Sequence, residues 1–496
     1  MPVTSNRRND GAWIRRHPLA VAVAATILAC SGESGDLRPS IVLVVIDTLR
    51  ADAVSAYGAV EGTTPEFDAL AAEGLLYRRA FAPSPWTLPS HASLFSGLGV
   101  DRHGVGFGGQ MGLPSELTTI AERLRDAGYA TAGFSENPLV SAPFGMDQGF
   151  ERFVAVTVDD LRKRSGNSGE LQFDIVEKIT AFASQRDRSR PYFLFVNLLD
   201  PHQPYRDREI NRFLPSGVSV GKAWTPSRLE QTADLICDRL PSSVDLEILH
   251  GLYLGGIAAA DAKLGRIVEI AEEASSAGGL VVVATSDHGE HFGEHRLLDH
   301  EFSVRAPVLE IPLAVHGLPD TEPGRIDTPV DLADIAASIL RWAGIGAPPD
   351  LAGRPLPTRP SETAPTGADL LALYSDEPLR TPEKWDRPGL KPEMDRNAKR
   401  EGCGPEDRVF GPMAAITRWP FKLIWFQRYP AELYDLSWDP MERSDLALIQ
   451  PDVRASLLEA VRRLIDESGL THGATDEAAT PSAEELEVLQ GLGYVE

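Results

Sequence analysis

The chain reads Ser-Ile-Val-Leu-Val-Val-Ile over residues 40–46 and places Asp47 directly after this run. An unbroken apolar run rich in β-branched residues is typical of a strand buried on both faces, as in a parallel sheet. Residues 191–199 and 280–285 form two more such runs, and helical patterns lie between them. This alternation predicts an α/β fold with a large domain built on a central, mostly parallel sheet flanked by helices.

The remaining elements follow from periodicity and from glycine or proline at their ends. Helices are expected over 64–74, 117–127, 173–183, 246–274 and 331–343, and further strands over 129–134 and 310–316. Four short apolar segments near the C-terminus predict a small antiparallel sheet: 371–375, 414–418, 421–426 and 431–436. A helix over 453–466 is expected to pack on this sheet, which defines a small α+β subdomain.

The chain has 496 residues, more than one hydrophobic core usually serves. We expect a large α/β domain over 38–345, a proline-rich linker over 346–367, a C-terminal subdomain over 368–470 and a polar tail over 471–496. A signal segment over 1–29 and a linker over 30–37 precede them. The formal net charge of −24 argues against a nucleic-acid partner, but it does not exclude an anionic substrate, because a bound cation can reverse the local field.

The N-terminus has the pattern of an export signal. Four arginines precede the apolar run 18–29, which is too short to span a bilayer. Residues 27–30 read Ile-Leu-Ala-Cys and resemble a bacterial lipoprotein cleavage site, so Cys30 is expected to carry lipid and to anchor the protein in the cell envelope. An ordinary cleaved signal and an uncleaved anchor are the alternatives. Whether Cys237 and Cys403 pair stays open.

Polar residues follow the three buried runs at their C-terminal ends, where ligands gather in open α/β sheets. Asp47 follows the first run, His202 the second, and Asp287 and His288 the third. Side chains at one edge of a sheet converge although they are far apart in sequence. The two carboxylates and the imidazole of His288 suit Mg²⁺, Mn²⁺ or Ca²⁺, and Zn²⁺ accepts the same ligands.

A candidate nucleophile lies in the segment 83–97, which turns from prolines into small and apolar residues. Pro89 suits the first turn of a helix, which places Thr87 just ahead of the helix N-terminus. The free N–H groups there attract anions, so a hydroxyl at this position can attack an anionic ester. The alternative is that Thr87 is an ordinary helix cap.

Several motifs together carry a family resemblance. Residues 46–50, 87–94, 200–205 and 286–290 resemble motifs of the sulfatase family of the alkaline-phosphatase superfamily. Further matches follow in the family's order at 293–295, 312–315, 331–334, 434–436, 439–440 and 492–495. The resemblance implies a metal-dependent ester hydrolase.

The chain departs from the family pattern at the nucleophile. Sulfatases read Cys-x-Pro-x-Arg and convert the cysteine to formylglycine, whereas Thr87 and His91 hold the Cys and Arg positions here. Threonine nucleophiles occur in relatives that act on phosphorus, such as lipoteichoic acid synthases and phosphoethanolamine transferases. Thr48 stands where the family has a second aspartate. By resemblance to these enzymes and to phosphonate monoester hydrolases, one divalent metal is expected on Asp47, Thr87, Asp287 and His288.

The resemblance also implies catalytic roles. His91 is placed to orient Thr87 or neutralise charge, His202 to protonate the leaving group, and His300 to hold the non-bridging oxygens where sulfatases often carry lysine. His103, His291 and His295 are expected to be structural. The expected activity is hydrolysis of phosphate or sulfate esters, with phosphorus preferred and a small-molecule, glycan-linked or lipid-linked substrate. The alternatives are an envelope transferase of phosphoryl-linked groups and a non-catalytic binding lipoprotein.

Overall fold

The computed structural model describes residues 36–60, 62–107, 110–157, 160, 173–205, 213–215, 241–300, 302–346, 348–359, 362, 369–375, 411–427 and 429–468. The expectations for the signal segment with Cys30, for Cys237 and Cys403, and for the tail after residue 470 lie outside these residues. Within them, no helix is both long enough and apolar enough to cross a membrane.

An eight-stranded sheet lies at the centre of the fold, as expected, with strand order β12-β2-β11-β7-β1-β6-β4-β5. Only β11 runs antiparallel to its neighbours in this sheet. The strands are β1 (Ser40–Ile46), β2 (Leu75–Tyr77), β4 (Ala130–Ser135), β5 (Arg152–Ala155), β6 (Tyr192–Leu198), β7 (Leu280–Thr285), β11 (Leu313–His316) and β12 (Gly324–Ile326).

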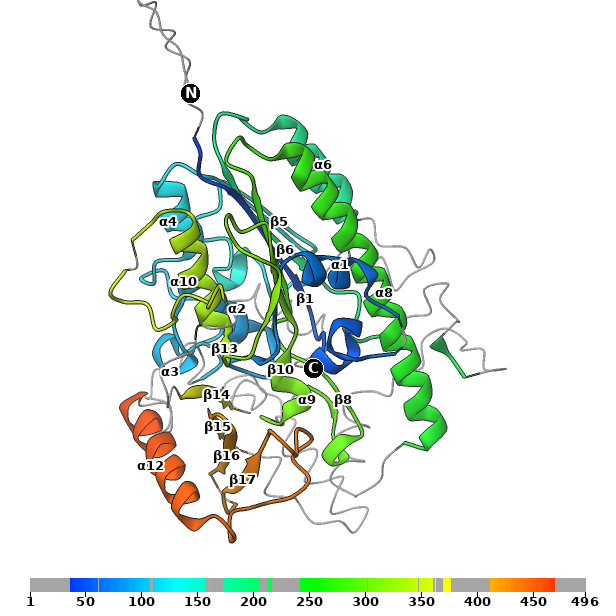
Figure 1. Ribbon diagram of the computed structural model, residues 1–496, viewed down its shortest axis with the longest axis vertical. Coiled ribbons are helices and arrows are strands. Elements are labelled where there is room, and N and C mark those ends of the chain that lie inside the picture. The colour runs from blue at the N-terminus through cyan, green and yellow to red at the C-terminus, as the bar shows by residue number, and fades with distance from the viewer. Residues whose placement is uncertain are drawn as a thin grey trace, which may run out of the picture. The chain divides into compact units, whose positions relative to one another are not determined.

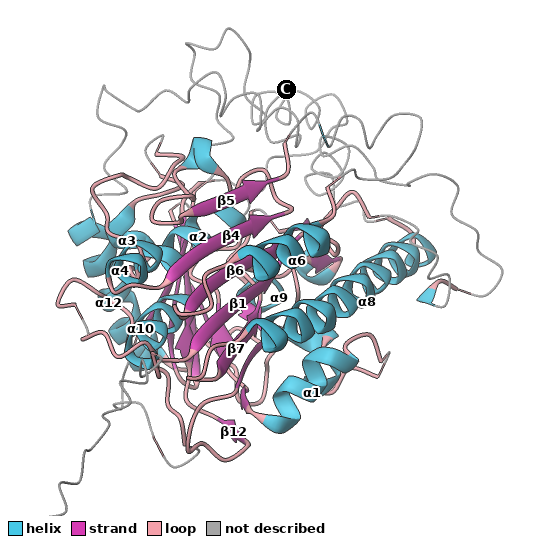
Figure 2. Ribbon diagram, turned by 90° about the horizontal axis from the view of Figure 1, so that it is seen from above, coloured by secondary structure: helices cyan, strands magenta, loops and turns pink. Residues whose placement is uncertain are grey.

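Helices cover both faces of this sheet (Figure 2). On one face lie α1 (Pro65–Glu73), α6 (Ile175–Gln185) and α8 (Ser243–Ala274); on the other lie α2 (Thr87–Ser96), α4 (Ile120–Asp126) and α10 (Leu332–Trp342). Strand β1 contributes side chains to the hydrophobic cores on both faces of the sheet, because successive side chains of a strand point to opposite faces. Its odd-numbered apolar residues join the core under α2 and α10, and its even-numbered ones join the core under α8. The continuous apolar run of β1 follows from this double burial.

One predicted strand is wrong as a single element. The run 310–316 forms β10 (Glu310–Ile311) and β11, which belong to different sheets. Pro312 separates them, since proline has no N–H to donate to a sheet. β10 pairs with β3 (Ala80–Phe81), whose other neighbour is β13 (Val330–Asp331). The remaining short elements are α3 (Val100–His103), α9 (Ala306–Leu309), β8 (His291–Phe292), β9 (Leu298–Asp299) and the 3₁₀ turns Ala51–Ala53, Ser55–Tyr57, Ala142–Phe144 and Glu294–Arg296.

The C-terminal antiparallel sheet is also confirmed (Figure 1). Its strands pair in chain order: β14 (Leu370–Tyr374), β15 (Met413–Arg418), β16 (Phe421–Phe426) and β17 (Glu432–Asp435). Helix α12 (Pro451–Ser468) packs on β15 and β16. Leu373 donates its backbone N–H to the carbonyl of Pro83 over 3.0 Å, so β14 touches the segment that leads into α2.

A buried ion cluster joins this sheet to the large domain. The ammonium of Lys422 and the carboxylate of Glu442 form a pair whose two side chains are almost fully buried. Arg305, just before α9, pairs with Glu432 and lies 3.6 Å from the second oxygen of Glu442. Removing one member of such a cluster leaves an uncompensated charge in a poorly hydrated place.

The variant Lys422→Met is therefore expected to lower the free energy of unfolding by about 3 kcal/mol. Urea titration followed by circular dichroism measures the loss. The matched control is Arg266→Met, because Arg266 and its partner Glu269 are mostly exposed and should change the free energy by less than about 1 kcal/mol. The double variant K422M/E442M should recover much of the loss, and equal stability of all variants would contradict the cluster's role.

Candidate active site

Asp47 lies at the C-terminal end of β1, in the middle of the sheet. Its backbone N–H donates to the carbonyl of Leu198 at the end of β6 over 2.9 Å, which fixes the start of the turn. The carboxylate is fully buried. Its Oδ2 accepts from Nδ2 of Asn137 over 2.8 Å, while Oδ1 has no hydrogen-bond partner among the described residues. One carboxylate oxygen is thus held, and the other is left for a ligand.

Asp287 follows β7, the neighbour of β1, and has the same arrangement. Its Oδ1 accepts the backbone N–H of Thr48 over 3.3 Å and that of His288 over 3.0 Å. Thr48 adopts the left-handed region with φ of 58°, a conformation that places its N–H toward Asp287. Oδ2 of Asp287 has no hydrogen-bond partner among the described residues. Burial, together with the nearby charge of Asp47, raises the pKa of Asp287 well above its usual value.

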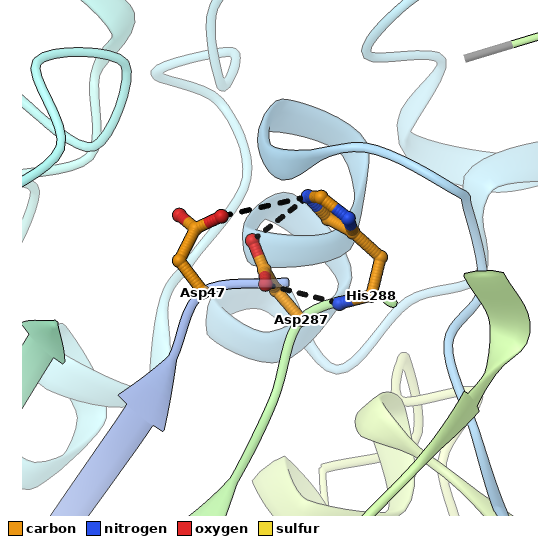
Figure 3. Close-up of side chains that lie close together, drawn as sticks. All are labelled: Asp47, Asp287 and His288. Carbon is orange, nitrogen blue, oxygen red and sulfur yellow. Dashed lines mark hydrogen bonds and ion pairs between the residues drawn. The ribbon is translucent and has the colours of Figure 1, made fainter. Parts of the chain in front are cut away.

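His288 completes the group (Figure 3). Its Nδ1 donates to the carbonyl of Gly289 over 3.0 Å, so the lone pair is on Nε2. Nε2 lies 3.7 Å from Oδ1 of Asp47 and 3.5 Å from Oδ2 of Asp287. Burial lowers the pKa of His288 well below its usual value, with a further contribution from the charge of His300. The ring is therefore neutral, as a metal ligand must be.

These three groups fit a divalent cation. Two buried carboxylates each present an unpaired oxygen to one space, and an imidazole lone pair faces the same space. Two carboxylates in an apolar interior are costly unless a cation compensates them. Oxygen-rich ligands with one imidazole match the preferences of Mg²⁺, Mn²⁺ and Ca²⁺, and also admit Zn²⁺. Asp47, Asp287 and His288 could therefore hold such an ion.

Thr87 lies beside this group. It is the first residue of α2, and Trp86 is the N-cap. The expected place of Thr87 just ahead of the helix is therefore wrong by one residue, and the alternative that Thr87 caps the helix is wrong as well. Its fully buried Oγ1 lies 3.4 Å from Nε2 of His288 and 3.4 Å from Nδ2 of Asn137. The N-terminal end of α2, which carries partial positive charge, thus presents a hydroxyl to the carboxylate pair.

His91 follows Thr87 by one helical turn. Its Nδ1 donates to the backbone carbonyl of Thr87 over 3.0 Å and lies 3.5 Å from Oδ2 of Asp287. Its Nε2 faces Nδ2 of Asn197 at 3.4 Å. Burial lowers the pKa of His91 to about 4, against an opposing effect of Asp47. At neutral pH it is an uncharged donor that supports the start of α2.

His300 and His202 lie on loops that reach the same place. The ring centroid of His300 is 4.4 Å from that of His288 and 5.2 Å from that of His202. Nδ1 of His300 lies 2.8 Å from Asp299 and 3.2 Å from Glu290. Burial alone would lower the pKa of His300, but these two carboxylates raise it well above its usual value.

Nδ1 of His202 donates to the carbonyl of Gln203 over 2.5 Å, which leaves Nε2 as the free ring nitrogen. The Nε2 atoms of both His202 and His300 are buried and have no hydrogen-bond partner among the described residues. They are available to a bound ester.

The structure thus brings all seven candidate residues together. Of the histidines expected to be structural, His103 hydrogen-bonds to Ser93 over 2.9 Å and to the backbone of Val105, which agrees with that expectation. Sequence reasoning missed Asn137, which contacts both Asp47 and Thr87. A usable signal existed, because Asn137 follows the expected strand at 129–134, as Asp47 follows β1.

The fold and this site define an ester hydrolase with a candidate metal-binding group. Residues 39–345 match the sulfatase family model, and the chain belongs to the sulfatase family. Among curated relatives, an uncharacterised sulfatase, YidJ, of Escherichia coli is 24% identical, over 86% of this chain and 87% of the relative. An arylsulfatase of Clostridium perfringens is 23% identical, over 68% of this chain and 81% of the relative.

Solved structures share the fold. The phosphonate monoester hydrolase of Agrobacterium radiobacter superposes with a TM-score of 0.67 and 21% identity, over 89% of this chain and 99% of that one. The protein BT4656, solved in complex with its substrate D-glucosamine-2-N,6-O-disulfate, superposes with a TM-score of 0.65 and 19% identity, over 89% of this chain and 100% of that one. Both sulfate-ester and phosphonate-ester enzymes are therefore built on this fold.

Proposed function

We propose that the protein hydrolyses phosphate esters in preference to sulfate esters, with Thr87 as the covalent nucleophile. The observation that supports this most is the place of the Thr87 hydroxyl. It is fully buried at the start of α2 and lies 3.4 Å from the imidazole nitrogen that faces both carboxylates. A bound divalent cation at Asp47, Asp287 and His288 would favour the ionised form of this hydroxyl and neutralise the ester's charge.

The preference for phosphorus follows from the chemistry of threonine. A formylglycine hydrate carries two hydroxyls on one carbon, so it can expel sulfate by breaking its own C–O bond. Thr87 has one hydroxyl on Cβ, and its ester must be opened by a second attack at the phosphorus or sulfur atom. Thr87 therefore favours an ester whose central atom accepts two successive in-line attacks, as phosphorus does.

The first step forms the ester on Thr87. The ionised Thr87 oxygen attacks phosphorus, and the bond from phosphorus to the alcohol oxygen breaks. The imidazolium of His202 gives its Nε2 proton to that oxygen, which leaves as the free alcohol. Nδ1 of His202 donates to a carbonyl in the structure, so Nε2 is the nitrogen that exchanges the proton.

The second step reverses these roles. Neutral His202 takes a proton from water at Nε2, and the resulting hydroxide attacks phosphorus while the Thr87 oxygen leaves. Thr87 is again ionised and His202 again protonated, so one water is consumed and one phosphate and one alcohol are released. His300, held as an imidazolium by Asp299 and Glu290, can donate from Nε2 to a non-bridging oxygen in both steps.

The test is a panel of aryl sulfates, phosphate monoesters, phosphate diesters and phosphonate monoesters, each with Mg²⁺, Mn²⁺, Ca²⁺ or Zn²⁺ added to metal-free protein. At least one phosphorus ester should have a kcat/KM above that of every sulfate. Faster turnover of a sulfate than of all phosphorus esters would refute the preference. Added alcohols that capture the phosphoryl group in place of water would favour the transferase alternative.

We further propose export to the bacterial cell envelope with lipid on Cys30. The support is the N-terminal sequence: arginines, an apolar run of twelve residues at 18–29, and the Ala29-Cys30 junction. Mass spectrometry of the membrane-extracted protein should find an acylated Cys30 at the mature N-terminus, and Cys30→Ser should release the protein from membranes. An unmodified mature chain that starts elsewhere would contradict this prediction.

A further inference from the structure

We propose that Asn137 is a further catalytic residue: its side-chain amide fixes which oxygen of Asp47 faces the cation and donates to the attacking oxygen of Thr87. The part about Thr87 rests on the proposed function, whereas the part about Asp47 does not. Nδ2 of Asn137 donates to Oδ2 of Asp47 over 2.8 Å and toward Oγ1 of Thr87 over 3.4 Å. One NH₂ group thus touches both a candidate ligand and the nucleophile.

The amide of Asn137 is fixed in orientation. Its Oδ1 accepts the backbone N–H of Leu139 over 2.9 Å, so the NH₂ group is the end that faces the site. Ser135 holds the main chain on the other side, because its hydroxyl donates to the carbonyl of Asn137 over 2.8 Å and accepts its N–H over 3.0 Å. The side chain is 2% exposed. The donor therefore needs no rearrangement when a substrate arrives.

A partly buried lysine holds the segment that carries Asn137. Nζ of Lys263, on α8, lies 2.6 Å from Glu136 and 2.7 Å from Asp200. Glu136 also accepts the backbone N–H of Leu199 over 3.1 Å. These contacts join the chain just after β4, which carries Asn137, to the chain just after β6, which carries His202.

The consequence for Asp47 is a choice of oxygen. With Oδ2 engaged by Asn137, Oδ1 is the oxygen of Asp47 that has no hydrogen-bond partner among the described residues, and it lies on the side of His288. Groups that orient a metal ligand in this way typically contribute 10-fold to 100-fold in metal affinity. Toward Thr87, the amide of Asn137 is a hydrogen-bond donor to Oγ1. This oxygen is negatively charged before it attacks and again when the phosphoryl group leaves it.

A purely structural role of Asn137 is the competing explanation. Its Oδ1 contact with Leu139 is an ordinary turn interaction of asparagine. Asn137→Ser separates the two explanations, because the serine hydroxyl can still accept the Leu139 N–H but has no NH₂ group to reach Asp47 or Thr87. A turn residue would tolerate serine, whereas a residue of the reaction would not.

The experiment compares wild type, Asn137→Ser, Asn137→Ala and the control Asn197→Ala. Asn197 is also a buried asparagine, opposite Ser135 on the neighbouring strand, and it contacts His91 rather than Asp47 or Thr87. Titration calorimetry of metal-free protein with Mn²⁺ measures the dissociation constant directly. Steady-state kinetics with the best phosphorus ester at saturating Mn²⁺ measures kcat and KM, and thermal unfolding confirms that each variant is folded.

Both Asn137 variants should bind Mn²⁺ at least tenfold more weakly than wild type, and Asn197→Ala within about threefold. At saturating metal, kcat of both Asn137 variants should fall about 100-fold with little change in KM, since the lost bond acts on the reacting oxygen. Wild-type metal affinity in folded Asn137→Ser, or an equal loss in Asn197→Ala, would overturn the role toward Asp47. Wild-type kcat in Asn137→Ser would overturn the role toward Thr87. If Thr87 is never labelled while Mn²⁺ affinity falls as expected, the nucleophile assignment fails and the Asp47 part stands.

Discussion

Replacing Thr87 by alanine is expected to lower kcat by about 10⁴-fold or more, because the covalent route is lost. Metal binding should stay, since Asp47 and Asp287 keep their unpaired oxygens and His288 keeps its imidazole beside them. Folding should be preserved as well, because the hydrogen bonds of Thr87 Oγ1 to His288 and Asn137 are long, 3.4 Å each. Kinetics on the best phosphorus ester, together with elemental analysis, checks both expectations in one preparation.

Two further substitutions sharpen this prediction. Thr87→Ser retains the hydroxyl and should keep part of the activity. Thr87→Cys should not create a sulfatase, because His91 still stands at the arginine position of the family motif. Brief incubation of wild type with a phosphodiester, acid quench and peptide mapping should find the phosphorus adduct on Thr87. An adduct on another residue, or unchanged turnover by Thr87→Ala, would refute the assignment.

Asp47→Ala and Asp287→Ala are each expected to remove bound metal and activity together. Each carboxylate supplies an oxygen and half of the charge that compensates a divalent cation, so one alone leaves the ion under-coordinated and its charge only half balanced. Elemental analysis after gel filtration, with activity measured on the same sample, tests the link between the two losses. Activity is expected to fall at least 100-fold in each variant, which is about the lower end of the losses found when one transition-state donor is removed.

Asp261→Asn is the matched control for these variants. Asp261 is also a buried carboxylate and accepts the backbone N–H groups of Glu66 and Phe67, each over 2.9 Å. It contacts none of the residues of the site in the described structure, so its variant should retain metal even if its stability falls. Full metal content in Asp47→Ala or Asp287→Ala would contradict the ligand assignment, and metal loss in Asp261→Asn would show that burial of a carboxylate alone explains the effect.

The sequence predicted the parts of the site that follow directly from buried strands. Asp47 and Asp287 end runs that are apolar on both faces, and such runs occupy the middle of a parallel sheet, where neighbouring ends are close. Asp47 and Asp287 then lie close together because β1 and β7 are neighbours in the sheet. The single apolar run 310–316 was misread as one strand because periodicity does not register the missing N–H of Pro312.

The end of the expected strand at 129–134 could have drawn attention to Asn137, but the contacts of Asn137 and the partners of His300 depend on tertiary structure. Asparagine before proline is typical of a turn, and only the hydrogen bond to Leu139 turns its NH₂ group toward Asp47. The charge of His300 depends on Glu290 and Asp299, which lie ten residues and one residue before it, and the pairing of β8 with β9 brings the more distant Glu290 to the ring. The left-handed turn at Thr48 is likewise a tertiary outcome, since threonine does not favour that conformation.

The positions of the site residues relative to the central sheet have a consequence for protein engineering. Asp47, Asn137 and Asp287 stand within two residues of the ends of strands of the central sheet. His202 lies in the loop after β6, and His300 follows the short strand β9, which lies outside that sheet. Loops accept insertions and exchanges far more readily than a packed sheet does. A library that randomises loop positions around His202 and His300 should therefore yield variants with new ester selectivity that retain the metal site of Asp47, Asp287 and His288. Directed evolution of these loops would in that way change which ester is accepted without changing the residues that bind the metal.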